Sequence, residues 1–284
     1  MEEQDKFCDY LGDVTPVWCP GCGNYGVLSG LVEALMDLKL RTQELALISG
    51  IGCSSRLPYF IKAYGFHGIH GRGLPIAQGV KTANPGLTVV AVGGDGDGLA
   101  IGGGHLPHAI RNNADITYIL FNNAIYGMTK GQFSPTTLLS PLTKTSPFGL
   151  PGEPVNPAAL AIVYGAGFVA RGFSVKKDHL KELIIQGIRH PGFSFIEVLT
   201  SCAAFNTTDM NVARIIKNLD SVPESHDPED VTEAFKLATH SERIYLGILR
   251  RSRRPTLAEK IEAMQLTAKE KGAVKFEDLV QQFA

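Results

Sequence analysis

Two oxygen-bearing side chains, Asp95 and Asn123, follow two apolar runs of the sequence. The runs Thr88–Val92 and Ile116–Phe121 have the composition of buried parallel strands. The first leads into the glycine-rich stretch Gly93–Gly96, and a helical stretch separates it from the second. Two parallel strands joined by a crossover helix end at the same edge of a sheet, so we expect Asp95 and Asn123 to lie side by side there.

A carboxylate and an amide oxygen are hard ligands that suit Mg²⁺, which takes its remaining ligands from phosphates and water. Glycines beside the carboxylate let the backbone approach a ligand closely. The pattern therefore predicts a metal-bridged diphosphate site rather than a plain glycine-rich turn. A nicotinamide site fits less well, because its fingerprint places an acidic residue at the end of the next strand, and here that strand ends in two asparagines.

Four of the five cysteines are expected at the same edge of the sheet. Cys19 and Cys22 form a C-x-x-C loop before a predicted amphipathic helix, Tyr25–Leu40. Cys53 and Cys202 each follow an apolar run that is predicted to be a strand. From this spacing three sites stay open: a redox-active dithiol, structural zinc and a [4Fe–4S] cluster. Cys8 lies outside the pattern and is expected to be a free thiol on an N-terminal arm.

Composition narrows the class of protein. The net charge of −1 and the pI of about 6.7 give no sign of a nucleic-acid partner. No apolar run approaches the ~18 residues of a membrane span, and the acidic N-terminus lacks a signal-peptide core. We expect a cytoplasmic protein that binds no membrane.

The 284 residues suffice for one large domain and an extension. Alternating apolar runs and amphipathic stretches predict an α/β fold, a doubly wound and mostly parallel sheet, over residues 1–216. Residues 217–284 are charged and are predicted to form a helical extension that contacts a partner. The Pro-, Ser- and Thr-rich segment 127–157 is expected to be a functional loop, such as a lid or an interface arm.

Several motifs in one order resemble those of the β subunits of 2-oxoacid:ferredoxin oxidoreductases: WCPGCG, GIGCSSR, HGRGLPIAQGVK, GDGDG…FNN and TSC. The resemblance spans about residues 14–215. It implies a sheet of the thiamine-diphosphate-binding type, with thiamine diphosphate, Mg²⁺ and a [4Fe–4S] cluster as cofactors. The implied cluster ligands are Cys19, Cys22, Cys53 and Cys202.

The same resemblance assigns residues to the thiamine site. Asp95 and Asn123 would bind Mg²⁺ together with the backbone carbonyl of Ile125. Arg56 would recognise a substrate carboxylate, and His70 would act beside the cofactor. The implied cofactor contacts are Gly52, Ser54, His70, Gly71, Gly94, Asp95, Gly96, Asp97, Asn123 and Ile125.

The implied reaction is oxidative decarboxylation of a 2-oxoacid with coenzyme A, with electrons leaving through the cluster to ferredoxin. The pyrimidine-binding half and the activating glutamate would belong to a separate α subunit, in an (αβ)₂ assembly, so this chain alone should be inactive. The segment around Cys19 and Arg56 is most similar to the 2-oxoglutarate branch, which forms succinyl-CoA. Pyruvate or broad 2-oxoacid specificity, a non-oxidative thiamine decarboxylase and an electron-carrier subunit without thiamine are the alternatives.

Overall fold

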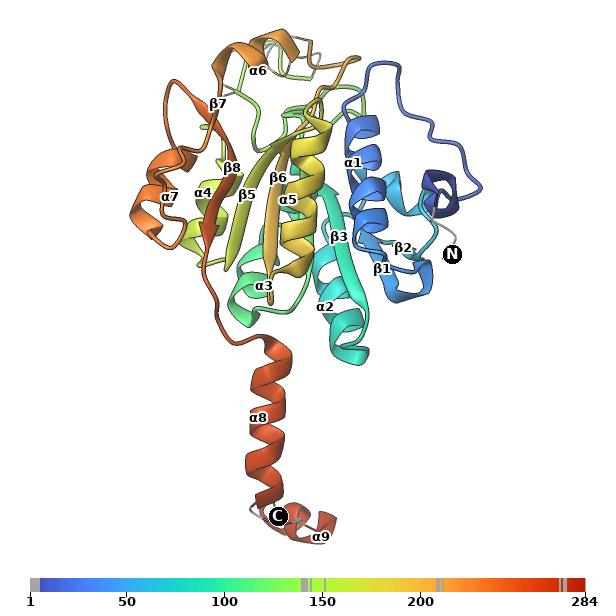
Figure 1. The fold of residues 1–284 in the computed structure, drawn as a ribbon, viewed down its shortest axis with the longest axis vertical. Helices are drawn as coiled ribbons and strands as arrows, with labels where there is room; N and C mark the ends of the chain where they lie inside the picture. Colours follow the sequence, from blue (N-terminus) through green and yellow to red (C-terminus); the bar gives the residue numbers. More distant parts are fainter. Residues whose placement is uncertain are drawn as a thin grey trace.

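The computed structural model describes residues 6–138, 143, 145–150, 152–207, 210, 212–270, 272 and 275–283. Within them the chain builds one eight-stranded sheet in the order β2-β1-β3-β4-β6-β5-β8-β7 (Figure 1). The strands are β1 (Leu45–Ser49), β2 (Tyr64–His67), β3 (Thr88–Gly94), β4 (Thr117–Asn122), β5 (Phe168–Phe173), β6 (Ser194–Leu199), β7 (Leu219–Ser221) and β8 (Ile244–Arg251). Neighbouring strands pair in parallel, apart from the antiparallel pair β5 and β8.

Helices cover both faces of this sheet. The α-helices of the described residues are α1 (Asn24–Asp37), α2 (Gly73–Ala83), α3 (Leu106–Asn112), α4 (Pro157–Val163), α5 (Lys177–Arg189), α6 (Val212–Asn218), α7 (Val231–Ala238), α8 (Leu257–Glu270) and α9 (Phe276–Gln281). In Figure 1, α1 and α5 lie together on the face turned to the viewer, and α2 and α3 lie behind the sheet. The predicted α/β class is therefore confirmed, since parallel sheets need helices on both faces.

Along the central strands, alternating side chains belong to two large buried clusters, and the last residues of β5 and β6 belong to a third, smaller one. On the α1 and α5 face, Leu47 and Ile119 pack in one cluster, while Ile48 and Leu120 pack with the helices of the opposite face. Every residue of β4 and β6 is buried. The continuous apolar runs seen in the sequence follow from this burial on both sides, because no face of these strands meets water.

The segment after residue 217 differs from the expected all-helical extension. Its first half supplies the strands β7 and β8 on either side of α7, and β8 extends the main sheet beside β5. Its second half is helical as expected: α8 and α9 project from the base of the sheet (Figure 1), and no described side chain of either helix is buried. The described residues include no helix with both the length and the apolarity of a membrane span.

A matched pair of leucine variants tests which elements stabilise the fold. Leu120 is 0 % exposed at the centre of β4, whereas Leu266 on α8 is 54 % exposed. We expect Leu120→Ala to lower the free energy of unfolding by about 2–5 kcal/mol, because it leaves a cavity in a packed core. Leu266→Ala should change it by less than about 0.5 kcal/mol. Urea unfolding of both variants measures the difference, and equal losses would contradict this view of the core.

Candidate active site

The two predicted oxygen ligands lie at the carboxyl ends of adjacent strands. Gly94, the last residue of β3, pairs with Phe121 of β4, so the turns after both strands begin at the same level of the sheet. Asp95 then opens a π-helical turn, a rare element that is often found at functional sites. The backbone N–H of Asn123 donates to the Asp95 carboxylate. The predicted juxtaposition is thus present in the structure.

A small cavity of about 80 Å³ lies at this edge of the sheet. It is bordered by most of the residues that the sequence assigned to the cofactor: Gly52, Ser54, His70, Gly94, Asp95, Gly96, Asp97, Asn123 and Ile125. At Gly52 the backbone has a φ of +132°, and an added Cβ would meet open space. A side chain there would be strained and would fill the approach to the cavity, so glycine leaves room for a ligand.

Asp95 is buried, with its carboxylate directed at hydroxyl groups of a distant loop. Thr136 Oγ1 lies 2.6 Å from Asp95 Oδ2, and Ser134 also contacts the carboxylate. Burial raises the pKa of Asp95 above its ordinary value, although these hydroxyls and the Asn123 N–H act in the opposite direction. A desolvated carboxylate of this kind is a site where a bound cation would be strongly favoured.

Asp97 binds the loops that surround the cavity. Its Oδ1 accepts hydrogen bonds from the backbone N–H of Ile51 at 2.9 Å and of Gly71 at 2.7 Å. His70 Nδ1 lies 3.1 Å from the same oxygen, without hydrogen-bond geometry. Burial raises the pKa of Asp97, and the two backbone donors lower it. Gly71 stands just outside the cavity lining, where an added Cβ would lie 2.5 Å from the backbone nitrogen of Gly102.

The turn that follows β4 is held by its own asparagine side chains. Asn122 Oδ1 accepts from the Ala124 N–H at 3.2 Å, and Asn123 Oδ1 accepts from the Ile125 N–H at 3.0 Å. Ala124 has a φ of +53°, a conformation that is unfavourable for a residue with a Cβ. Thr137 Oγ1 donates to the Ala124 carbonyl at 2.6 Å. These contacts keep a strained turn beside the cavity in one conformation.

Three segments bring the four predicted cluster cysteines to one place. The backbone N–H of Gly23, next to the C-x-x-C loop, donates to the carbonyl of Ser201 at 3.0 Å. The Sγ atoms of Cys202 and Cys53 lie 3.5 and 3.8 Å from the position that a Cβ on Gly127 would take. Cys53 also borders the small cavity, so the thiols adjoin the predicted diphosphate site.

The thiols influence one another electrostatically. Burial, with negative charge on Cys202, Cys53 and Cys19, raises the pKa of Cys22 to about 11. Burial and the charges of Cys202 and Cys19 raise the pKa of Cys53. These shifts keep the thiols protonated, so a positive charge such as that of a metal centre would be needed to hold them together as thiolates. Within the described ranges, however, no three His, Cys, Asp or Glu side chains are close enough to hold a single metal ion.

The remaining predicted residues are Arg56 and Cys8. Arg56 is half-buried in the 3₁₀ turn Ser54–Tyr59, and its positive charge lowers the pKa of Cys53. It lies outside the lining of the small cavity. Cys8 is exposed in another 3₁₀ turn, Phe7–Tyr10.

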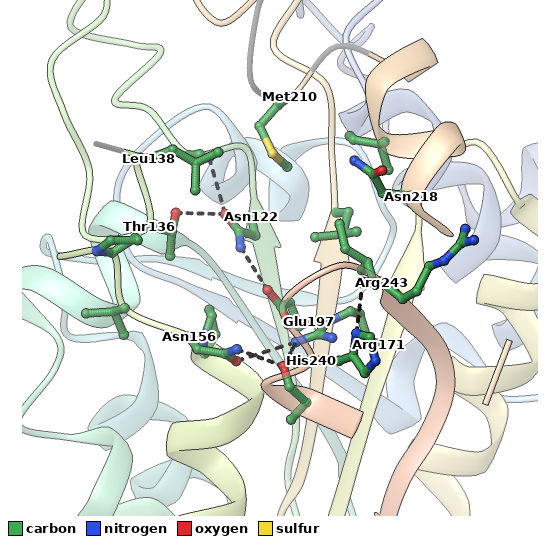
Figure 2. A pocket seen from close by; sticks show the side chains of 18 of the residues that line it. Asn122, Thr136, Leu138, Asn156, Arg171, Glu197, Met210, Asn218, His240 and Arg243 are labelled. Carbon is green, nitrogen blue, oxygen red and sulfur yellow. Dashed lines mark hydrogen bonds and ion pairs between the residues drawn. The ribbon is translucent and has the colours of Figure 1, made fainter. Parts of the chain in front are cut away.

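A second, larger cavity of about 350 Å³ has Asn122 in its lining (Figure 2). Its walls include Thr136, Arg171 and Glu197, which the sequence reasoning did not single out. A signal for the last two is present in the sequence, because each is a charged residue inside an apolar strand. Such residues are rarely buried unless they are paired. Thr136 carries no comparable local signal.

Comparison with known proteins identifies the family. The model for "Thiamine pyrophosphate enzyme, C-terminal TPP binding domain" matches residues 50–198. A second model, which describes the C-terminal part of the pyruvate ferredoxin oxidoreductase β subunit, matches residues 202–265. The two matches follow each other along the chain and together cover most of its sheet, although β1 lies before the first match.

Proteins of known name align with most of the chain. The β subunit of 2-oxoacid:ferredoxin oxidoreductase 2 of Aeropyrum pernix is 40 % identical over 86 % of this chain and 82 % of its own length. The 2-oxoglutarate oxidoreductase subunit KorB of Mycobacterium tuberculosis is 44 % identical over 75 % of this chain, which spans 57 % of that protein.

A solved structure has the same fold throughout. The 2-oxoglutarate:ferredoxin oxidoreductase of Magnetococcus marinus superposes with a TM-score of 0.93 at 39 % identity, covering 99 % of this chain and 97 % of the other. The thiamine-binding sheet, the resemblance over most of the length and the gathered site residues lead to one conclusion. The chain belongs to the family of β subunits of thiamine-dependent 2-oxoacid:ferredoxin oxidoreductases.

Proposed function

We propose that this chain is the β subunit of a 2-oxoglutarate:ferredoxin oxidoreductase, which converts 2-oxoglutarate and coenzyme A reversibly to succinyl-CoA and CO₂. The proposal depends on one observation: at one edge of the sheet, a cavity lined by Asp95 and Asn123 lies next to four thiols. The Magnetococcus marinus structure, described with 2-oxoglutarate, coenzyme A and succinyl-CoA bound, supports this substrate. Relatives named 2-oxoglutarate synthase subunit KorB, from Archaeoglobus fulgidus and Methanothermobacter marburgensis, support it as well.

In this proposal Asp95, Asn123 and the Ile125 carbonyl hold Mg²⁺, and the glycine turns Gly52 and Gly94–Gly96 let a diphosphate approach the backbone. Bound thiamine diphosphate supplies the electron sink that decarboxylation of a 2-oxoacid needs. The chain's own residues bind and orient the reactants. His70 faces the cavity beside Asp97, where its ring can exchange a proton, and Ser54 offers a hydroxyl.

Cys19, Cys22, Cys53 and Cys202 are proposed to hold a [4Fe–4S] cluster. Tetrahedral zinc draws its thiolates to about 2.3 Å of one ion, whereas a four-iron cluster binds each thiolate to a different iron and keeps them further apart. The thiols here interact electrostatically without forming a single-ion group among the described residues. A thiamine site beside the thiols favours the cluster over zinc, because a redox cluster there would have electrons to collect.

The activating glutamate and the pyrimidine half of the site are assigned to a separate α subunit, in keeping with the relatives named subunit β. We further propose that residues 217–284, which follow the 1–216 segment, contact that partner. The exposed apolar residues of α8 and α9, Met264 and Phe276 among them, support this assignment. A cytoplasmic (αβ)₂ assembly with ferredoxin as electron acceptor completes the proposal. Relatives with the general 2-oxoacid name make broad specificity the second candidate.

Removing the central carboxylate should separate the two cofactor sites. We expect Asp95→Ala to abolish retention of thiamine diphosphate and Mg²⁺, because the metal loses its charged ligand, while iron content stays near that of the wild type. Asp115→Ala, at the opposite end of the sheet, is the matched control. Cofactor and metal analysis of the αβ complex measures both, and tight thiamine binding by Asp95→Ala would remove Asp95 from the site.

The cysteine assignment predicts the metal content. Anaerobically purified protein should contain about four irons and four acid-labile sulfides per β chain. Cys22→Ser should lose most of this iron, whereas Cys8→Ser should retain it, because Cys8 lies outside the set. Zinc in place of iron, or loss of the cluster in Cys8→Ser, would contradict the assignment.

Substrate selection is assigned to Arg56. If its guanidinium binds a substrate carboxylate, Arg56→Ala should cost about 2–5 kcal/mol in transition-state binding, mainly because the carboxylate is left unpaired. If Arg56 binds the distal carboxylate, the loss should be far larger for 2-oxoglutarate than for pyruvate. If it binds the 1-carboxylate that both acids carry, the two losses should be equal. The measurement is kcat/KM for both acids in the αβ enzyme, with the exposed Arg41→Ala as control. Unchanged values for both acids would exclude Arg56 from the site.

A further inference from the structure

A buried ion pair crosses two central strands close to the proposed cofactor site. Arg171 of β5 lies opposite Glu197 of β6, and Arg171 Nε donates to Glu197 Oε2 at 2.7 Å. Their side chains are only 6 % and 3 % exposed. Burying such a pair is costly, and well-packed apolar residues would often give an equally stable sheet. The pair therefore calls for a role besides stability.

The guanidinium of Arg171 is anchored by two contacts besides the one with Glu197. Its Nη2 donates to Asn156 Oδ1 at 3.4 Å and to the carbonyl of Ala238 at 3.3 Å. Asn156 caps the first turn of α4, and Ala238 ends α7. Arg171 is thus fixed between two helix ends, and it fixes Glu197 in turn.

The second oxygen of Glu197 points to the cofactor turn. Glu197 Oε1 accepts from Asn122 Nδ2 at 2.8 Å, as Figure 2 shows. This contact sets which way the Asn122 amide faces, since Asn122 Oδ1 must then accept from the Ala124 N–H of the strained turn. Asn122 directly precedes Asn123, the proposed metal ligand. The orientation of one buried amide is therefore transmitted to the backbone that presents the ligand.

Thr136 connects the same amide to the other proposed metal ligand. Its Oγ1 lies 2.8 Å from Asn122 Oδ1 and 2.6 Å from Asp95 Oδ2. The hydroxyl has a single proton, so it cannot donate to both acceptors at once. A change in the orientation of the Asn122 amide alters how this proton is shared between the two acceptors. The change therefore also affects the hydrogen bond to the Asp95 carboxylate. The chain of contacts runs from Arg171 through Glu197, Asn122 and Thr136 to Asp95.

We propose that Glu197, held by Arg171, is a positioning residue for the Mg²⁺–diphosphate site, and that it acts through Asn122 on Asn123 and through Thr136 on Asp95. The inference rests on the proposed function of Asp95 and Asn123. Glu197 contacts neither metal nor diphosphate. It fixes the orientation of an amide on which both ligands depend, and such outer partners typically contribute about 10–100-fold to metal affinity.

Glu197→Gln tests the link with little change in shape. A glutamine has one acceptor oxygen for two donors, Arg171 and the Asn122 amide. If the glutamine oxygen accepts from Arg171, its NH₂ group faces the Asn122 amide nitrogen, and the orientation of Asn122 is lost. If the oxygen accepts from Asn122, the NH₂ group faces Arg171, and the contact with Arg171 is lost. We expect the Mg²⁺ concentration that half-saturates thiamine diphosphate binding to rise at least tenfold. Isothermal titration of the cofactor-free αβ complex measures this, and the iron content should remain that of the wild type.

Two further variants separate positioning from general stability. Thr136→Val keeps the size of the side chain and removes the shared hydroxyl, so it should also weaken Mg²⁺-dependent binding at least tenfold. In the double variant with Glu197→Gln the loss should be smaller than the product of the two single losses, because both act on one amide. Lys81→Met removes a partly buried ion pair with Asp115 away from this edge, and it should lower the Tm without changing cofactor affinity.

Wild-type affinity in either Glu197→Gln or Thr136→Val, or independent losses in the double variant, would overturn the proposal. If Glu197→Gln does not fold, Thr136→Val decides the matter. Asp95→Ala distinguishes the two levels of inference. Should that variant bind the cofactor normally, the proposed function itself fails. Should it lose binding while Glu197→Gln does not, only the positioning role fails.

Discussion

One buried carboxylate, that of Asp97, holds together the loops on which the cofactor edge depends. It sits in the turn after β3 and accepts backbone hydrogen bonds from Ile51, after β1, and from Gly71, after β2. A carboxylate removed from water needs such donors, and here the donors come from separate loops. Three loops that are distant in sequence are thereby fixed at one place. The open backbone at Gly52 keeps its position because of this arrangement.

The other half of the edge is organised by a second buried acid. Glu197 connects β5 and β6 to the turn after β4, as Asp97 connects the turns after β1, β2 and β3. The two networks meet where Asp95 faces Asn123. The thiol cluster lies beside this junction, because the loop after β6 carries Cys202 and the loop after β1 carries Cys53. The proposed diphosphate site and the proposed cluster site are therefore held by the same strands.

Much of this arrangement could be predicted from the sequence, because apolar runs ending in glycine, asparagine or cysteine identify strand ends at one edge of a parallel sheet. The convergence of the thiols and the placement of Asp95 beside Asn123 were predicted in this way, whereas the other cofactor contacts were implied only by the family resemblance. Thr136 was missed, since nothing local indicates that a long loop returns to Asp95. The pairing of Arg171 with Glu197 is a contact between distant strands. The strand β8 was missed because its sequence is charged and alternates only weakly. Its extended conformation depends on pairing with β5, which is distant in sequence.

The position of β8 determines whether the two matched segments, residues 50–198 and 202–265, can be separated. The thiamine-binding model ends at residue 198, yet β5 from that segment is covered by β8 from the following one. A fragment cut at the model boundary would retain the diphosphate turn and lose Cys202, and it would expose the whole hydrogen-bonding edge of β5. Uncovered edges of this kind recruit further strands from neighbouring molecules. The segment that carries α8 and α9 thus also covers this edge of the sheet and shields it from self-association.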